Sequence, residues 1–222
     1  MSDVGRRDAL LIALTFAAGA VDAVAFLGLH VFTAVMTGNL VLLGVAIGQG
    51  AASNALRGIV AVGGYGIGVL AGARIVGVLP RETPWSRAVT RALMLEAALQ
   101  AIFLGGWILT DATPNGLAAF ALIAISGIAM GLQAATTRGV APGRSTTYLT
   151  GTLTGLLTEL SAVGVRADWW HRALIVIALV AGALAGAIAI STVPPVAPAI
   201  PLLVLAGVVL FTVTVTRDGS KA

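Results

Sequence analysis

The chain has 222 residues, of which 58% are hydrophobic and 10% charged, and its net charge is +4. This balance excludes an ordinary soluble domain, because a soluble fold of this length exposes far more charge. The absence of cysteine excludes disulfides and thiolate ligands for a metal. The sequence therefore predicts an integral membrane protein that contacts the lipid bilayer and has no nucleic-acid partner.

The apolar stretches, taken in chain order, predict the number of helices. A helix needs about 20 apolar residues to cross the hydrocarbon core of a bilayer. The first stretch is expected to be a span and not a cleaved signal peptide, because its apolar run is too long. No stretch has the alternating pattern of an outer-membrane barrel. We expect an all-α polytopic protein with spans near 9–28, 57–79, 90–109, 115–137, 171–191 and 197–216, and two shorter apolar segments at 31–49 and 146–165.

The distribution of basic residues favours one topology for these segments. If all eight segments crossed the membrane, seven Lys or Arg residues would lie inside and five outside. If 31–49 and 146–165 instead enter and leave by the same face, eleven lie inside and Arg57 alone lies outside, with Arg74 set aside because it lies within a span. Cytoplasmic loops carry an excess of basic residues. We therefore expect six spans, two re-entrant segments and both termini in the cytoplasm of a bacterial inner membrane.

Two motifs recur at nearly the same spacing, which predicts an internal repeat. Thr37-Gly38 is followed 113 residues later by Thr150-Gly151. A glycine ladder at 64, 68 and 72 is answered 114 residues later by Ala178, Gly182 and Gly186. The repeats would cover residues 1–113 and 114–222. Because each holds an odd number of spans, the second must be inverted relative to the first, an arrangement common in transporters.

Each re-entrant segment carries a polar turn within apolar sequence. The segments read FTAVMTGNLVLLG from residue 32 and STTYLTGTLTGLL from residue 145. Non-helical backbone at membrane depth is tolerated only where protein or a water-filled cavity satisfies its polar groups. A helix that restarts after such a break directs its positive end at the cavity and favours anionic or neutral polar solutes. The candidate substrate-binding residues are Thr37, Gly38, Asn39, Tyr148, Thr150, Gly151 and Thr152. The alternative is that these small residues only allow helices to pack closely.

Further polar residues lie inside the spans. Asp22 is deep in the first span, where a carboxylate is costly and by default a candidate for function. We expect Asp22 to be a proton-coupling residue that forms a second layer of the site with Gln133. The alternative is that Asp22 forms a structural hydrogen bond between the first span and the re-entrant turn. Arg74 is a candidate partner for Glu96, and the alternative is that its long side chain reaches the inner interface. Trp107, Trp169 and Trp170 are expected to lie at the membrane interfaces.

Enzyme activity is not expected. The two histidines lack metal-ligand spacing, and there is no HExxH, GxSxG or P-loop motif. No cofactor or metal is therefore predicted. The glycine ladder is expected to pack helices within one chain, and a homodimer seam is the other interpretation.

Four stretches together resemble a known family. They are GAVDAVAFLG, FTAVMTGNLVLLG, MGLQAATTRGVAPGRSTTYLTGTLTGLL and the glycine-rich third apolar segment. They resemble the YoaK family of small bacterial inner-membrane proteins, long catalogued as a domain of unknown function. The resemblance covers nearly the whole chain and implies a bacterial inner membrane, but it implies no substrate.

The sequence thus predicts a secondary permease or channel for a small polar or anionic solute. The solute would bind near the membrane midplane, between the Thr37-Gly38-Asn39 and Thr150-Gly151-Thr152 turns. The alternative is a non-transporting assembly or partner protein in which these turns are structural.

Overall fold

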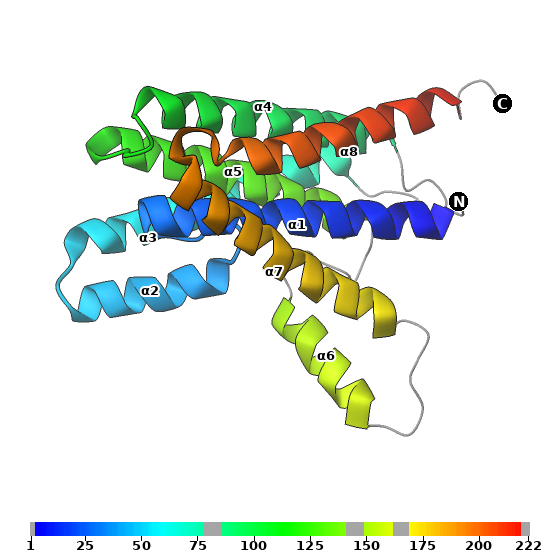
Figure 1. Cartoon of the computed structure of the whole chain (residues 1–222), viewed down its shortest axis with the longest axis horizontal. Coiled ribbons are helices and arrows are strands. Elements are labelled where there is room, and N and C mark those ends of the chain that lie inside the picture. Colours follow the sequence, from blue (N-terminus) through cyan, green and yellow to red (C-terminus); the bar gives the residue numbers. More distant parts are fainter. Residues whose placement is uncertain (1–2, 78–85, 141–148, 162–168, 219–222) are drawn as a thin grey trace.

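The computed structural model describes residues 3–77, 86–140, 149–161 and 169–218, and in these ranges every regular element is helical (Figure 1). The elements are α1 (Asp3–Leu29), α2 (Met36–Gly48), α3 (Ala52–Val76), α4 (Arg87–Leu109), α5 (Gly116–Val140), α6 (Leu149–Ser161), α7 (Trp169–Thr192), the short 3-10 helix η1 (Pro194–Val196) and α8 (Ala199–Asp218). The all-α prediction is confirmed.

Six of the described helices are long and apolar enough to cross a membrane. They correspond to α1, α3, α4, α5, α7 and η1 with α8, which are the six spans that hydropathy predicts. The two helices that begin at the polar turns, α2 and α6, have 13 residues each. At about 1.5 Å per residue α2 is near 20 Å long and too short to cross a bilayer. The residues on both sides of α6 lie outside the described ranges.

The long helices form a bundle in which the start of α1 and the end of α8 lie at the same end (Figure 1). α1 and α5 are the most buried of the long helices, and the others surround them. α1 packs most extensively on α7, and α5 packs most extensively on α3. Helices from the first and second parts of the chain are therefore interleaved.

Glycines allow the backbones of these two helix pairs to touch. In the α3–α5 pair, a Cβ added to Gly131 would lie 2.9 Å from the amide nitrogen of Val69. In the α1–α7 pair, a Cβ added to Gly19 would lie 3.0 Å from the amide nitrogen of Ala183. Gly131 follows Gly19 by 112 residues and Ala183 follows Val69 by 114, so the two close contacts match each other.

The glycine ladder of α3 lies within the same α3–α5 contact. Added Cβ atoms at Gly64 and Gly68 would meet the backbone of Ala124 and Ile128, and one at Gly72 would meet the side chain of Ala135. Because all three glycines face α5, the prediction that the ladder packs helices within one chain is confirmed.

Candidate functional site at the break between α1 and α2

The chain reverses direction after α1, near the end of the bundle opposite the start of α1 (Figure 1). His30 has a φ of 60°, a left-handed conformation that is uncommon outside glycine and allows a tight reversal. Residues 31–35 then run back along α1 without helical structure, and α2 starts at Met36 and returns toward the end where α1 finished (Figure 1). α3 begins at that same end, so α2 and α3 are antiparallel neighbours.

Asp22 holds this non-helical segment against α1. One carboxylate oxygen accepts hydrogen bonds from the N–H groups of Thr33 and Ala34, both at 2.7 Å, and the other accepts from Val35 at 3.1 Å. The Asp22 side chain is buried. Hydrogen bonds to an ionised acceptor are stronger than neutral ones, and here they satisfy three backbone donors that have no helical partner. Asp22 therefore has the structural contact that was the alternative to proton coupling.

Asn39 fixes the start of the same segment. Its side-chain oxygen accepts from the N–H of Phe32 at 2.9 Å, and its amide nitrogen donates to the carbonyl of Phe32. Its side chain is fully buried. The hydroxyl of Ser126 on α5 donates to that of Thr33 at 3.0 Å and joins the segment to the second half of the chain. The Asn39 side chain is therefore buried against the backbone of Phe32, and both its oxygen and its nitrogen form hydrogen bonds within the chain.

Thr37 and Gly38 lie differently, in the first turn of α2. Val35 is the N-cap of α2, and it provides no side-chain hydrogen bond to the helix. Within the described residues no group accepts from the N–H groups of Met36, Thr37 or Gly38. Thr37 is exposed, so its hydroxyl group is open to a solute, whereas Met36 and Gly38 are partly buried and Gly38 lies against the ring of Phe32. Of the predicted binding residues in this turn, Thr37 has an exposed side chain, Gly38 is partly buried and Asn39 is buried.

The Asp22 carboxylate changes the electrostatics of this helix end. Unsatisfied N–H groups make the first turn of a helix positive and attractive to anions. Here a carboxylate already lies beside the N-cap, bound to the N–H of Val35. A second anion would be repelled by it, so the turn favours a neutral solute with hydrogen-bond acceptors.

The second polar turn begins α6. Thr150, Gly151 and Thr152 lie in its first turn, but the side chain of Thr150 and all of Tyr148 lie outside the described residues. Gly151 is exposed. α6 has its main contact with α7, as α2 has with α3. That the two polar turns face one another across a solute stays a prediction.

Gln133 lies in a different polar cluster from Asp22. Its amide donates to the carbonyl of Leu14 at 3.4 Å, and it lies beside the carboxyl group of Glu96. Leu14 precedes Asp22 by two turns of α1, so Asp22 and Gln133 do not form one layer. Glu96 is only 1% exposed, whereas Arg74 is exposed. The predicted Glu96–Arg74 pair is therefore wrong, because Glu96 faces α5.

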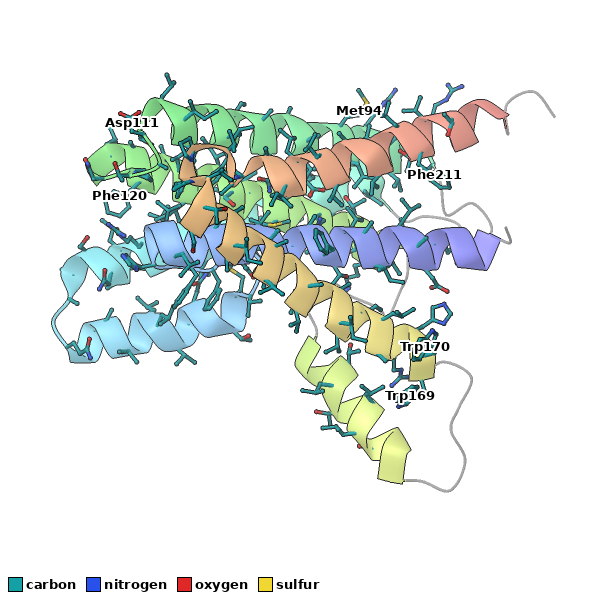
Figure 2. All side chains as sticks on the ribbon, viewed as in Figure 1. Met94, Asp111, Phe120, Trp169, Trp170 and Phe211 are labelled. Carbon is teal, nitrogen blue, oxygen red and sulfur yellow. The ribbon has the colours of Figure 1, made fainter. Side chains whose placement is uncertain are left out.

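The tryptophans differ in exposure. Trp107 is fully buried, and its indole N–H donates to the carbonyl of Pro194 at 2.8 Å. Gly28 makes room for it, since an added Cβ would meet the Trp107 ring. The prediction of an interfacial Trp107 is wrong, because its polar atom is satisfied inside the protein. Trp170 is 59% exposed beside Trp169 at the start of α7, as an interfacial position requires (Figure 2).

Arg57, the one basic residue expected outside, also has an internal partner. Its guanidinium donates to the carbonyl of Leu29 at 3.0 Å. This carbonyl belongs to the last turn of α1, which carries the negative end of the helix dipole. The charge of Arg57 therefore stabilises a helix end. Within the described ranges, no three His, Asp or Glu side chains converge as metal ligands.

The fold and its polar break are those of a polytopic α-helical membrane protein. Residues 10–214 match the family described as "Protein of unknown function (DUF1275)". The chain is also 40% identical over 164 residues to the UPF0700 transmembrane protein YoaK of Bacillus subtilis (strain 168), across 72% of this chain and 70% of that protein. The chain belongs to this family, which confirms the resemblance. No solved structure matches it.

Proposed function

We propose that the protein is a secondary permease or channel of the bacterial inner membrane for a small, neutral polar solute. The observation that carries the proposal is the first turn of α2. Its N–H groups at Met36, Thr37 and Gly38 have no acceptor among the described residues, and Thr37 beside them is exposed. At membrane depth such donors need water or a solute as partner. A hydroxyl or carbonyl group of a solute would supply it.

The proposed topology has six spans and two re-entrant segments. In it α2 enters and leaves by the outer face, and both termini are cytoplasmic. The length of α2, 13 residues, and its direction support this arrangement (Figure 1). The positive-inside distribution agrees with it, since Arg57, the single basic residue left outside, is held by the end of α1.

The proposal includes two inverted halves, residues 1–113 and 114–222. The close contacts of Gly19 with α7 and of Gly131 with α3 support it, because a twofold axis between the halves would superimpose one contact on the other. α1 and α5 run in opposite directions in the bundle, as do α3 and α7 (Figure 1). Opposite directions are what an inverted repeat requires.

The packing also suggests which parts move. α3, α4 and α5 with α2 form one group of closely packed helices, and α1, α7 and α8 with α6 form the other. The groups meet mainly through α1 with α5 and through α4 with α8. Asp22 and Ser126 lie at this boundary and both bond the segment before α2. Rocking of one group against the other would open the first turn of α2 to either face.

A thermal-shift screen of the purified protein tests the proposal. The panel contains polyols, amides, nucleobases and small carboxylates, each at high concentration. A ligand at 100 times its Kd stabilises the protein by about 2.7 kcal/mol. We expect a neutral solute to stabilise the wild type and Thr192→Val, but not Thr37→Val. Thr192 is the matched control, because its exposed hydroxyl bonds only the carbonyl of Ile188 in its own helix. A hit is then carried into a proteoliposome flux assay.

The other candidate is a non-transporting assembly protein whose polar turns are structural. The satisfied hydrogen bonds of Asp22 and Asn39 favour it. It predicts no stabilising solute in the panel, and a loss of stability in Thr37→Val as large as that in Asn39→Ala. That pair of results would contradict the permease proposal.

A further inference from the structure

Glu96 is a buried carboxyl group that the structure leaves partly unsatisfied. It is 1% exposed, and its Oε2 atom has no hydrogen-bond partner among the described residues. Its other contact is the amide of Gln133 on α5. Glu96 follows the start of α4 by nine residues, about 14 Å along the helix, so it lies well inside the span.

No described cation neutralises this carboxyl group. α4 packs on α5, α8, α3 and η1. Of the arginines on α5 and α3, Arg138 and Arg74 are exposed, while Arg57 donates to the carbonyl of Leu29. The described side chains of α8 and η1 carry no charge, and Arg87 and Arg91 on α4 itself are exposed. An ionised carboxylate without a counter-charge is costly in a bilayer, so a buried carboxyl group at this depth is by default a candidate for function.

A small cavity lies between Glu96 and the end of the bundle that holds the start of α1. Its volume is about 10 Å³ and its wall is apolar, so it leaves loosely packed space on that side of Glu96 but offers no polar partner to a water molecule. It is lined by Leu93, one turn before Glu96, and by Thr136, one turn after Gln133. The remaining lining residues come from α1, α4, α5 and α8. In the proposed topology this end is cytoplasmic.

We infer that Glu96, oriented by Gln133, is a proton-binding site that couples the proposed transport to protons from the cytoplasmic side. Asp22 does not fill this role, because its oxygens already accept three backbone N–H groups that need them. The free oxygen of Glu96 can take and release a proton without breaking a backbone contact. Gln133 lies at the boundary between the two helix groups and donates a hydrogen bond to Leu14 of α1. Protonation of Glu96 would therefore change a contact between the two groups.

The inference rests on the proposed function, but proton binding is testable without a substrate. Dicyclohexylcarbodiimide is an apolar reagent that adds to protonated carboxylic acids in membranes and forms a stable N-acylurea, with no leaving group. Trypsin cleavage after Arg91 and Arg138 gives a peptide with two carboxyl groups, Glu96 and Asp111. Asp22 lies on a different peptide, between Arg7 and Arg57.

The protein in liposomes is treated with the reagent at several pH values and the peptides are analysed by mass spectrometry. We expect an adduct on Glu96 whose yield falls as the pH rises, which is retained in Asp111→Asn and Asp22→Asn and lost in Glu96→Gln. Fragment ions locate the adduct in the wild type even if Glu96→Gln does not fold. An unmodified Glu96, a yield independent of pH, or protection by sodium ions at constant pH would overturn the inference.

The outcome separates the two proposals. Labelling of Glu96 without any solute hit supports a proton site in a protein that is not the proposed permease. A stabilising solute without labelling of Glu96 supports the permease proposal and contradicts proton coupling at Glu96.

Discussion

Adding one methyl group where two helix backbones touch should destabilise the protein far more than adding it elsewhere on the same helices. In Gly131→Ala the new Cβ would lie 2.9 Å from the amide nitrogen of Val69, and closer still to the carbonyl oxygen of Tyr65. An ordinary contact begins at 3.4 Å, so the Val69 contact alone requires α3 and α5 to separate by about 0.5 Å, and the closer Tyr65 contact requires more. Overpacking of this kind costs about 1–3 kcal/mol. Since backbone atoms cannot rotate away, we expect the upper part of that range.

Two comparisons make the prediction specific. Gly63→Ala and Gly66→Ala place the same methyl group on α3 where nothing lies within 4 Å, and they should be neutral or stabilising by up to about 1 kcal/mol. Gly19→Ala, with its 3.0 Å approach to Ala183, should cost as much as Gly131→Ala if the halves are related by symmetry. Unfolding of the purified variants by SDS in mixed micelles, followed by tryptophan fluorescence, measures the free energies. Equal stability of Gly131→Ala and Gly63→Ala would refute the reasoning.

Three further predictions concern buried polar groups, each measured by thermal unfolding in detergent. Asp22→Asn should cost about 2 kcal/mol, because one acceptor oxygen and the charge are lost from three backbone hydrogen bonds; an unchanged midpoint would show that the clamp contributes nothing. Asn39→Ala leaves both backbone groups of one residue unpaired and should cost about 2–4 kcal/mol, against none for exposed Thr37→Val. Trp107→Phe loses the hydrogen bond to Pro194 and part of a fully buried ring, so it should cost about 1–3 kcal/mol; an unchanged midpoint would contradict this prediction.

The sequence predicts the spans well because hydropathy reports them directly. The six long helices and the two short ones fall where apolar length and the polar turns indicate. The packing role of the glycine ladder is also predictable, since small residues spaced by four allow helices to pack closely. In the structure these glycines face α5. These features depend on residues near one another in the chain.

The partners of the polar residues could not be predicted, because they depend on which helix faces which. Asp22 bonds N–H groups 11 to 13 residues further on, which only the reversal at His30 brings back to it. Glu96 faces Gln133 because the consecutive helices α4 and α5 pack on one another, and spacing within α4 alone does not show which of its faces meets α5. Trp107 is near a helix end, as interfacial tryptophans are, yet Pro194 covers its indole N–H.

The central claim is that α2 enters and leaves the membrane by one face, so that its first turn opens within the bilayer. The chain has no cysteine, so single cysteines placed by Ser53→Cys, before the body of α3, and Ser86→Cys, before α4, report on topology without further changes. A membrane-impermeant maleimide should label position 53 in intact cells and position 86 only in inside-out vesicles. These two positions fix the orientation of α3, and a third cysteine placed by Ser2→Cys, before α1, decides the path of α2. Position 2 should label only in inside-out vesicles, opposite to position 53, because α1 alone then separates the two. Labelling of positions 2 and 53 from the same face would mean that α2 crosses the membrane and would contradict the account.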